Sequence, residues 1–376
     1  MIVFYILLLI ILSIYSYSLV DPNFTLINSH YWTLFRNTVV YFGYYQRFWS
    51  WIVYLILISA LFLFYFYFVR QVKKYHPLTL ALLIGGILLL SYPFLSHDFF
   101  NYLFDAKIVT YYFKNPYFTK ALDFPNDPWI RFMHWTHRTY PYGPFFLLIT
   151  LIPSFLSLGK LVLSFLLFKI TWFIFYLSSV YLLNKLNKKW SMIFATHPLI
   201  IIEGLINAHN DLIGLCLAFI GIYYLSKNKN LLGRIILVFS AGIKYMTFPL
   251  VFLVKPQVHP RGEPQAQPHP GGVILVLVGL VMILGYLTFY AEIQPWYFLT
   301  LFAFLPYLEK FISRLEIFFI GLLLSYYPYI RFGGWDSLEK LQLKHIIILV
   351  FLVINVIYFV GTLFKNEKIN KLHFQK

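Results

Sequence analysis

Two aspartates lie seven positions apart in a segment rich in aromatic residues, a combination of carboxylates and flat rings that can take up protons and stack against a ligand. Asp98 and Asp105 follow an apolar run over residues 78–96, and another apolar run begins at Phe145. This spacing places both carboxylates on one face of a helix that starts at Asp98. An acidic residue where a membrane helix ends is energetically unfavourable unless it has a functional role or a partner of opposite charge. We therefore predict a catalytic role for Asp98, with Asp105 and the adjacent His97 as further catalytic candidates.

The loop after Asp98 is long and carries many aromatic rings. Its tyrosines and tryptophans include Tyr111, Tyr112, Tyr117, Trp129, Trp135, Tyr140 and Tyr142. Rings beside carboxylates suit stacking against sugars, although an aromatic belt at a membrane surface contains the same residue types. The second acid and the apolar flanks favour a functional site over a simple polar helix end.

Two further polar boundaries interrupt the apolar runs. The first is the turn His209-Asn210-Asp211, and the second is Gln294-Pro295-Trp296-Tyr297. A tight turn capped by asparagine and aspartate needs no histidine, so we predict that the first boundary contributes to a site on the same side of the membrane as Asp98. At the second boundary, a belt of aromatic residues explains the rings equally well.

Two basic residues stand where an anion could bind. Lys244 lies deep inside the apolar run 231–254, where a lysine costs about 2.5–3.5 kcal/mol on insertion scales. Its side chain could reach the surface, but its distance from both ends of the run favours a buried anionic partner, for which a phosphate is one candidate. Arg331 is the best placed outer arginine for a phosphate, because a guanidinium binds phosphate through two hydrogen bonds.

The composition requires a membrane protein built from helices. Of the 376 residues, 60% are hydrophobic and only 12% are charged, and the mean hydropathy is +0.72. A soluble domain of this size needs more charge to cover its surface. The apolar runs have helical length and lack the alternation of a membrane β-barrel. We therefore predict an all-α, multi-pass bundle of about 10–12 transmembrane or re-entrant helices, forming one domain over residues 1–376.

The basic residues predict the orientation of the chain in its membrane. They cluster in short connectors, namely 70–74, 185–189, 227–234 and the tail from Lys365. Under the positive-inside rule these connectors are cytoplasmic, which places the loops 21–47 and 97–144 and every aspartate outside. The net charge of +16 therefore argues for membrane lipids as partners and against nucleic acid. We expect the plasma membrane of a prokaryote.

Two apolar stretches predict irregular helices. Residues 145–183 contain two runs separated at 157–160, so one of them should be a short helix that does not span the membrane. The run 231–254 is interrupted near Gly242 and Lys244 and again at Pro249, which predicts two half-helices or a re-entrant hairpin. Broken backbone at membrane depth is tolerated where it lines a cavity.

In their order and spacing, these segments resemble the GT-C superfamily of integral-membrane glycosyltransferases. Asp98, Asn115-Pro116-Tyr117 and Tyr140-Pro141-Tyr142-Gly143-Pro144 match that family's first outer loop, and the later boundaries, including residues 240–244, match its later landmarks. The resemblance extends over residues 80–331. The chain is most similar to the bacterial polyprenyl-phosphate-mannose-dependent mannosyltransferases, and part of the loop also looks like the catalytic subunit of GPI mannosyltransferase I.

The resemblance implies that Asp98 is the general base for transfer of mannose or another hexose from a polyprenyl-phosphate donor. The acceptor would be a hydroxyl group of a glycan, lipid or protein at the outer membrane face, and a single displacement predicts inversion of the anomeric centre. Many relatives carry two acids where this chain has Ser96-His97-Asp98, so His97 replaces the second acid, and we expect neither a metal nor a cofactor. The expected substrate-binding residues are Tyr102, Asn115, Tyr117, Tyr140, Tyr142, His209, Asn210, Asp211, Lys244, Gln294, Trp296, Tyr297 and Arg331.

Two other classes of protein could use similar residues. A transporter or flippase of lipid-linked sugars would place its ionisable groups near the membrane midplane, whereas here the acids gather on one face. A polysaccharide polymerase or ligase should have a larger arginine-rich outer loop late in the chain, and the loop 331–343 is short. We therefore favour a glycosyltransferase.

Overall fold

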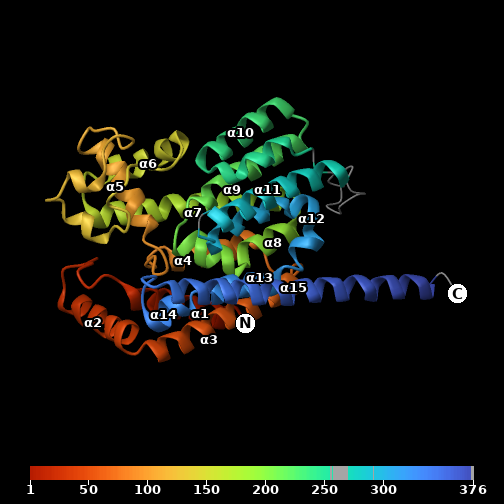
Figure 1. Ribbon diagram of the computed structural model, residues 1–376, viewed down its shortest axis with the longest axis horizontal. Helices are drawn as coiled ribbons and strands as arrows, with labels where there is room; N and C mark the ends of the chain where they lie inside the picture. The colour runs from red at the N-terminus through yellow and green to blue at the C-terminus, as the bar shows by residue number, and fades with distance from the viewer. Residues whose placement is uncertain (255, 257–269, 291, 374–376) are drawn as a thin grey trace.

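The computed structural model describes residues 1–254, 256, 270–290 and 292–373, and no strand occurs in this part of the chain (Figure 1). The helices are α1 (Ile2–Tyr15), α2 (His30–Tyr45), α3 (Arg47–Arg70), α4 (Pro77–Leu88), α5 (Asp98–Thr110), α6 (Pro144–Leu156), α7 (Leu161–Leu186), α8 (Lys188–Thr196), α9 (Asp211–Ser226), α10 (Asn230–Ile243), α11 (Pro270–Tyr290), α12 (Leu305–Ile312), α13 (Glu316–Leu324), α14 (Tyr327–Phe332) and α15 (Leu338–His373). Shorter helical turns are η1 (Ser16–Leu19), η2 (Ala121–Asp123), η3 (Pro128–Phe132), η4 (Ile200–Ile206), η5 (Tyr245–Phe252) and η6 (Pro295–Phe304). The predicted all-α bundle is confirmed.

Four helical stretches in the described residues are long and apolar enough to cross a membrane: 2–19, 47–70, 161–186 and 338–362. The pair formed by α8 and η4, bent by 69°, makes a fifth if it is counted as one span. Five further apolar helices, at 77–88, 144–156, 211–226, 230–243 and 272–288, are shorter. The chain is therefore an integral membrane protein in which several predicted runs are short or broken.

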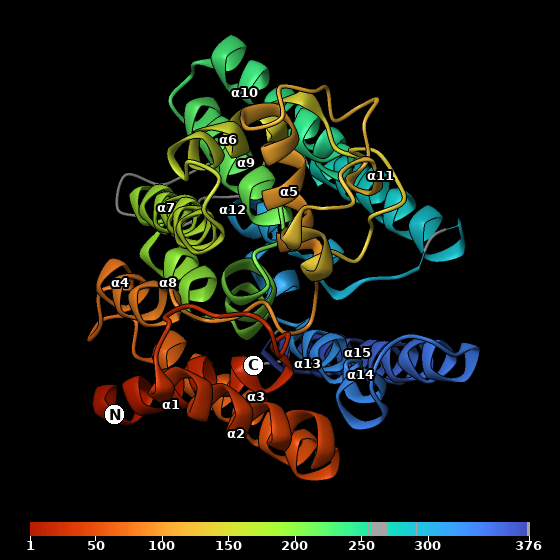
Figure 2. The same cartoon turned by 90° about the vertical axis from the view of Figure 1, so that its left-hand side faces the viewer.

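The helices form two sides with a layer between them. Figures 1 and 2 show α1, α2, α3 and α13–α15 along one side and α9–α11 along the other, with α7 and α8 between them. Helix α3 shows how the sequence produces this packing: Tyr54, Leu61 and Phe68 recur every seven residues and are fully buried, whereas Ile56 and Leu63 are exposed. A helix that is apolar on all sides can face the protein core with one side and lipid with the other.

Helix α5 and the loop that follows it form one end of the molecule (Figure 1). The Lys107 ammonium lies 2.5 Å from Asp127 Oδ2 and 3.9 Å from the ring centre of Trp129. The Tyr112 hydroxyl donates a hydrogen bond to the same carboxylate at 2.6 Å. This buried ion pair ties the loop down onto α5, which fixes the segment that carries Asp98.

Two helix breaks shape the middle of the bundle. After α8 the chain bends at His197-Pro198 into the π-helical turn η4. The buried ammonium of Lys169, on α7, donates to the carbonyl oxygens of Leu205 and Ile206 at 2.9 and 2.8 Å. A cation at a helix C-terminus satisfies carbonyls that have no partner within the helix. The predicted interruption near Lys244 is also present, because Lys244 has extended backbone between α10 and η5.

Two predicted boundaries differ from the structure. Residues 21–47, expected as an outer loop, contain α2, whose N-terminus is capped by Ser29 through a 3.1 Å bond from the Trp32 amide. The apolar run 78–96 is helical only to Leu88. Pro93 follows, and proline disfavours helical backbone in the residue before it. The irregular segment that results leads directly to Asp98.

Candidate active site

Two segments that the sequence singled out meet at a pair of glycines. Gly143, before α6, lies so close to Gly242, on α10, that a Cβ atom on Gly143 would stand 1.8 Å from the Gly242 carbonyl oxygen. Only glycine permits such an approach of two backbones. The contact holds the end of the aromatic loop against the break that exposes Lys244.

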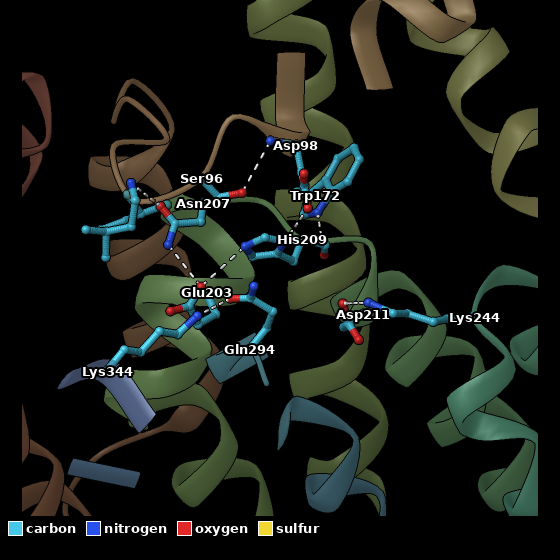
Figure 3. A network of polar contacts seen from close by, with 12 residues as sticks. Ser96, Asp98, Trp172, Glu203, Asn207, His209, Asp211, Lys244, Gln294 and Lys344 are labelled. Atoms are coloured by element: carbon cyan, nitrogen blue, oxygen red, sulfur yellow. Dashed lines mark hydrogen bonds and ion pairs between the residues drawn. The ribbon is translucent and has the colours of Figure 1, made fainter. Parts of the chain in front are cut away.

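Asp98 and His209, predicted from distant parts of the sequence, face each other (Figure 3). Asp98 is the first residue of α5, where an acid suits the helix N-terminus, and its amide donates to Ser96 Oγ at 3.2 Å. His209 follows Ala208, whose φ of 54° turns the chain sharply between η4 and α9. The Asp98 Oδ2 and His209 Nδ1 atoms lie 3.7 Å apart, with the Asp98 side chain 16% exposed and that of His209 fully buried. A partly exposed carboxylate beside a buried imidazole can exchange protons with a bound ligand.

His209 is held by three contacts, two to its ring and one to its backbone. Its ring stacks on Trp296 with centroids 3.9 Å apart and planes 14° apart. The backbone carbonyl oxygen of His209 accepts a 3.0 Å hydrogen bond from the Trp172 indole N–H. Its Nε2 lies 3.4 Å from Oε2 of Glu203, a fully buried acid of η4. The ring therefore presents its two nitrogens to two carboxylates.

Lys244 has a protein partner, and that partner is the third residue of the predicted polar turn. Its ammonium lies 2.6 Å from Asp211 Oδ2, with the lysine side chain 12% exposed and the aspartate fully buried. The same ammonium stands 4.9 Å from the ring centre of Tyr297. Asp211 is therefore a buried anionic partner of the kind expected for Lys244, and the break after α10 brings the lysine to this carboxylate at the start of α9. The binding of a phosphate by Lys244 stays a prediction.

Four of the predicted substrate-binding tyrosines form a continuous group of rings. Tyr102 and Tyr142 have centroids 5.3 Å apart, Tyr140 and Tyr142 5.4 Å, and Tyr117 and Tyr140 5.3 Å. Tyr117 is the most open of them, with 36% of its surface exposed. Asn115 has a local structural role, since its Oδ1 accepts the Tyr117 amide at 2.9 Å. The rings run from α5 to the solvent side of the loop.

Asp105 lies on α5 two turns beyond Asp98, as predicted, but in a different environment. It borders a small hollow with Asn101, Trp135 and Arg138. Burial raises the pKa of Asp105 to about 8, helped by the charge of Asp98 and opposed by Arg138. Asp105 therefore carries a proton at neutral pH and can donate a hydrogen bond.

His97 turns away from Asp98. Its Nδ1 lies 3.3 Å from the carbonyl oxygen of Phe132, in the loop. Burial lowers the pKa of His97, so the ring is neutral and its Nδ1–H donates to that carbonyl. This contact holds the loop to the start of α5.

Two other predicted residues have partners other than Asp98 and His209. The Arg331 guanidinium stands over the rings of Phe48 and Phe332, at 5.5 and 5.3 Å. The Gln294 Oε1 accepts a hydrogen bond from the Lys344 ammonium at 2.8 Å.

Sequence reasoning missed two residues of the polar centre that Figure 3 shows around Asp98 and His209, namely Glu203 and Lys344. Glu203 is the single acid of the apolar run 191–206, and an ionisable residue inside a membrane helix is a functional candidate by default, so the signal was present. Lys344, on α15, pairs with Glu292 at 2.5 Å. It stands near the start of an apolar run and resembles an ordinary interfacial lysine in the sequence.

The polar residues of this centre have hydrogen-bonding capacity that the described chain does not use. Thirteen buried side-chain atoms lack a hydrogen-bond partner in the described residues, and six of them belong to residues 203–211. Most buried polar atoms in proteins are paired. Such a concentration marks a place where a polar ligand or ordered water can bind. No group of three or more His, Cys, Asp or Glu side chains in the described residues is arranged to hold a metal ion.

Comparison with known proteins identifies the family. Neither the curated proteins nor the solved structures contain a match to this chain. The family described as alpha-(1->6)-mannopyranosyltransferase, N-terminal domain, matches residues 12–258. That region carries Asp98, His209, Asp211 and Lys244, whereas Trp296 and Lys344 lie beyond it. Because the match covers more than half of the chain, this membrane protein belongs to the alpha-(1->6)-mannopyranosyltransferase family and is a mannosyltransferase.

Proposed function

We propose that the protein transfers mannose from a polyprenyl-phosphate donor to a hydroxyl group of a glycan, lipid or protein acceptor, with Asp98 as the general base. The observation that carries this proposal is the contact between Asp98 and His209, at 3.7 Å, in a buried polar centre inside a helical membrane protein. Glycosyl transfer to a hydroxyl needs a group that accepts its proton as the new bond forms. Asp98 is partly exposed and borders the cluster of tyrosines, so an acceptor hydroxyl can reach it.

The protonation of Asp105 supports a mechanism with one base. A retaining enzyme uses a second carboxylate as nucleophile. Asp105 is a poor candidate for that role, because its pKa of about 8 keeps it neutral at pH 7. A single displacement with Asp98 as base gives inversion at the anomeric carbon.

Lys244 and Tyr297 support a donor that carries a phosphate on a lipid. An ammonium has three N–H donors, and Asp211 occupies one direction at 2.6 Å. A phosphate oxygen could bind a second N–H while the pair with Asp211 stays intact. Apolar helices surround this position, which suits a polyprenyl chain. Arg331 is retained as a second candidate for the phosphate.

The location that we propose is the outer face of a prokaryotic plasma membrane. The basic connectors at 70–74, 185–189 and 227–234 favour a cytoplasmic position for those turns. The loop 97–144 would then lie outside, together with Asp98. A flippase of lipid-linked sugars is not favoured, because the family match is to transferases.

The donor can be tested with purified protein in detergent or liposomes. The protein is given either a polyprenyl-phosphate mannose or GDP-mannose, each with labelled mannose, together with a mannose-containing acceptor. We expect transfer from the lipid donor, and product analysis should show inversion. Efficient transfer from GDP-mannose in the absence of any lipid-linked mannose would contradict the proposal.

A further inference from the structure

Glu203 is a buried acid that the proposed function leaves unexplained. Its side chain is fully shielded from solvent, in a helical turn made otherwise of isoleucine, leucine and glycine. Its Oε2 accepts a 3.0 Å hydrogen bond from Asn207, and its Oε1 has no hydrogen-bond partner among the described residues. Burying a carboxylate in an apolar region is costly unless charge and hydrogen bonds compensate. Asn207 donates the one hydrogen bond to this carboxylate among the described residues, and the nearby Lys344 ammonium (Figure 3) is already paired with Glu292, so these contacts are a weak reason for its presence.

The geometry connects Glu203 to Asp98 through one ring (Figure 3). His209 Nε2 lies 3.4 Å from Glu203 Oε2, and Nδ1 lies 3.7 Å from Asp98 Oδ2. The stack on Trp296 limits the tilt of the ring. A neutral imidazole has one N–H and one bare nitrogen, and the group that accepts the N–H decides which nitrogen is bare. Both distances are longer than a hydrogen bond, as is common in the absence of substrate.

We propose that Glu203 is a positioning residue, which acts through His209 on the proton that Asp98 removes. Glu203 accepts the Nε2–H of His209, and the bare Nδ1 then faces Asp98. This inference depends on the proposed function, in which Asp98 is the base.

The acceptor oxygen bonds to the anomeric carbon while its proton moves to Asp98, and the bond from that carbon to the phosphate oxygen breaks, with the electron pair leaving on the phosphate. The proton on Asp98 then passes to His209 Nδ1, which gives an imidazolium between two carboxylates. Release of that proton to solvent, after product leaves, restores the starting state.

Other charged groups near the ring already have partners of opposite charge. Lys244 pairs with Asp211 at 2.6 Å. Lys344, whose ammonium is drawn close to Glu203 in Figure 3, pairs with Glu292 at 2.5 Å. These pairs leave Glu203 and Asp98 as the anions that directly face the imidazole.

A purely structural role for Glu203 is the competing explanation. Asn207 bonds to Glu203 with one side-chain atom and accepts the Leu95 amide with the other, at 3.2 Å. Glu203 could therefore act only by holding the segment that leads to Asp98. Such a role would change stability and the overall rate but not the pH dependence of the rate.

The test is the kcat–pH profile of Glu203→Gln with a polyprenyl-phosphate mannose as donor. Glutamine keeps the shape and the contact with Asn207 but removes the charge. We expect kcat to fall at least tenfold with an unchanged donor KM, and the acid limb of the profile to move to lower pH, because loss of the anion makes a protonated His209 less favourable. Glu203→Asp should recover part of the rate and a wild-type acid limb.

Glu316→Gln is a matched control, because Glu316 forms another buried contact with a histidine, His197, at 3.1 Å, away from Asp98. It should lower the melting temperature but leave the acid limb in place. A folded Glu203→Gln variant with a wild-type pH profile would overturn the inference. If that variant does not fold, His209→Gln decides, because an amide cannot take the proton as an imidazole does, and a wild-type kcat in this variant would overturn the inference equally. Failure of the proposed function itself is recognised separately, by Asp98→Asn that still transfers mannose.

Discussion

The pH dependence of stability should reveal the buried acid on α5. Asp105 is 7% exposed, and burial raises its pKa from 3.8 to about 8. The folded protein therefore holds this proton more tightly than the unfolded chain does. Between these two values the unfolded chain loses the proton and the folded protein keeps it, so stability falls as pH rises. Below pH 4 both states are protonated, and above pH 8 the loss is complete.

The magnitude follows from proton linkage. One proton bound by the folded state alone changes the free energy of unfolding by about 1.36 kcal/mol per pH unit. From pH 5 to pH 8 the wild-type protein should lose about 4 kcal/mol through Asp105. Asp105→Asn removes this loss, because asparagine does not titrate. The variant should resemble wild type at pH 5 and be the more stable of the two at pH 8.

The assay is the melting temperature of the detergent-solubilised protein, followed by tryptophan fluorescence between pH 5 and pH 8.5. The difference between wild type and Asp105→Asn should grow by several degrees across this interval. Asp336→Asn is the control, because Asp336 has a 75% exposed side chain and its pKa is lowered by a hydrogen bond from Lys340. Parallel profiles for wild type and Asp105→Asn would refute the assignment of a raised pKa to Asp105.

Three further predictions concern the contacts around the site and the orientation of the chain. Gly143→Ala should lower both transfer and melting temperature, because its Cβ would lie 1.8 Å from a carbonyl oxygen of α10, whereas Gly86→Ala, in open space, should change neither; equal behaviour of the two variants would contradict this. Lys244→Met should lower the free energy of unfolding by about 3–5 kcal/mol, because it leaves the carboxylate of Asp211 unpaired. Adding Asp211→Asn should restore stability without restoring donor binding, and normal donor binding in the double variant would place the phosphate elsewhere. A cysteine at the exposed Asn126 should react with an impermeant thiol reagent only from outside the cell, since the native cysteine is buried; labelling only from the cytoplasmic side would reverse the proposed orientation.

Much of the site could be predicted because its residues are polar or charged and stand beside or within apolar segments. Asp98 and His209 are polar residues at the ends of apolar runs, and the structure brings them within 3.7 Å of each other. Helix α5 also begins at Asp98 and includes Asp105, as the spacing indicated. A charged residue in an apolar segment carries information by itself, without knowledge of the fold.

The partners of these residues could not be predicted in the same way. The pair formed by Lys244 and Asp211 depends on how the break after α10 packs against the start of α9, and pairing across 33 positions leaves no periodic signal in the sequence. Trp296 was expected to bind substrate, with an aromatic belt as an equally good explanation, and neither interpretation indicated its stack on His209. Such contacts depend on tertiary packing, whereas hydropathy and spacing report only local preference.

The most direct test of the central claim is mannose transfer by Asp98→Asn from a labelled polyprenyl-phosphate mannose at pH 7. Asparagine has nearly the same shape but cannot take the proton of the acceptor hydroxyl. The variant should fold, with a melting temperature close to that of wild type, and transfer should fall by about 10²–10⁴-fold, as expected for loss of a general base. Turnover near the wild-type rate in the folded variant would contradict the assignment of Asp98 as the base.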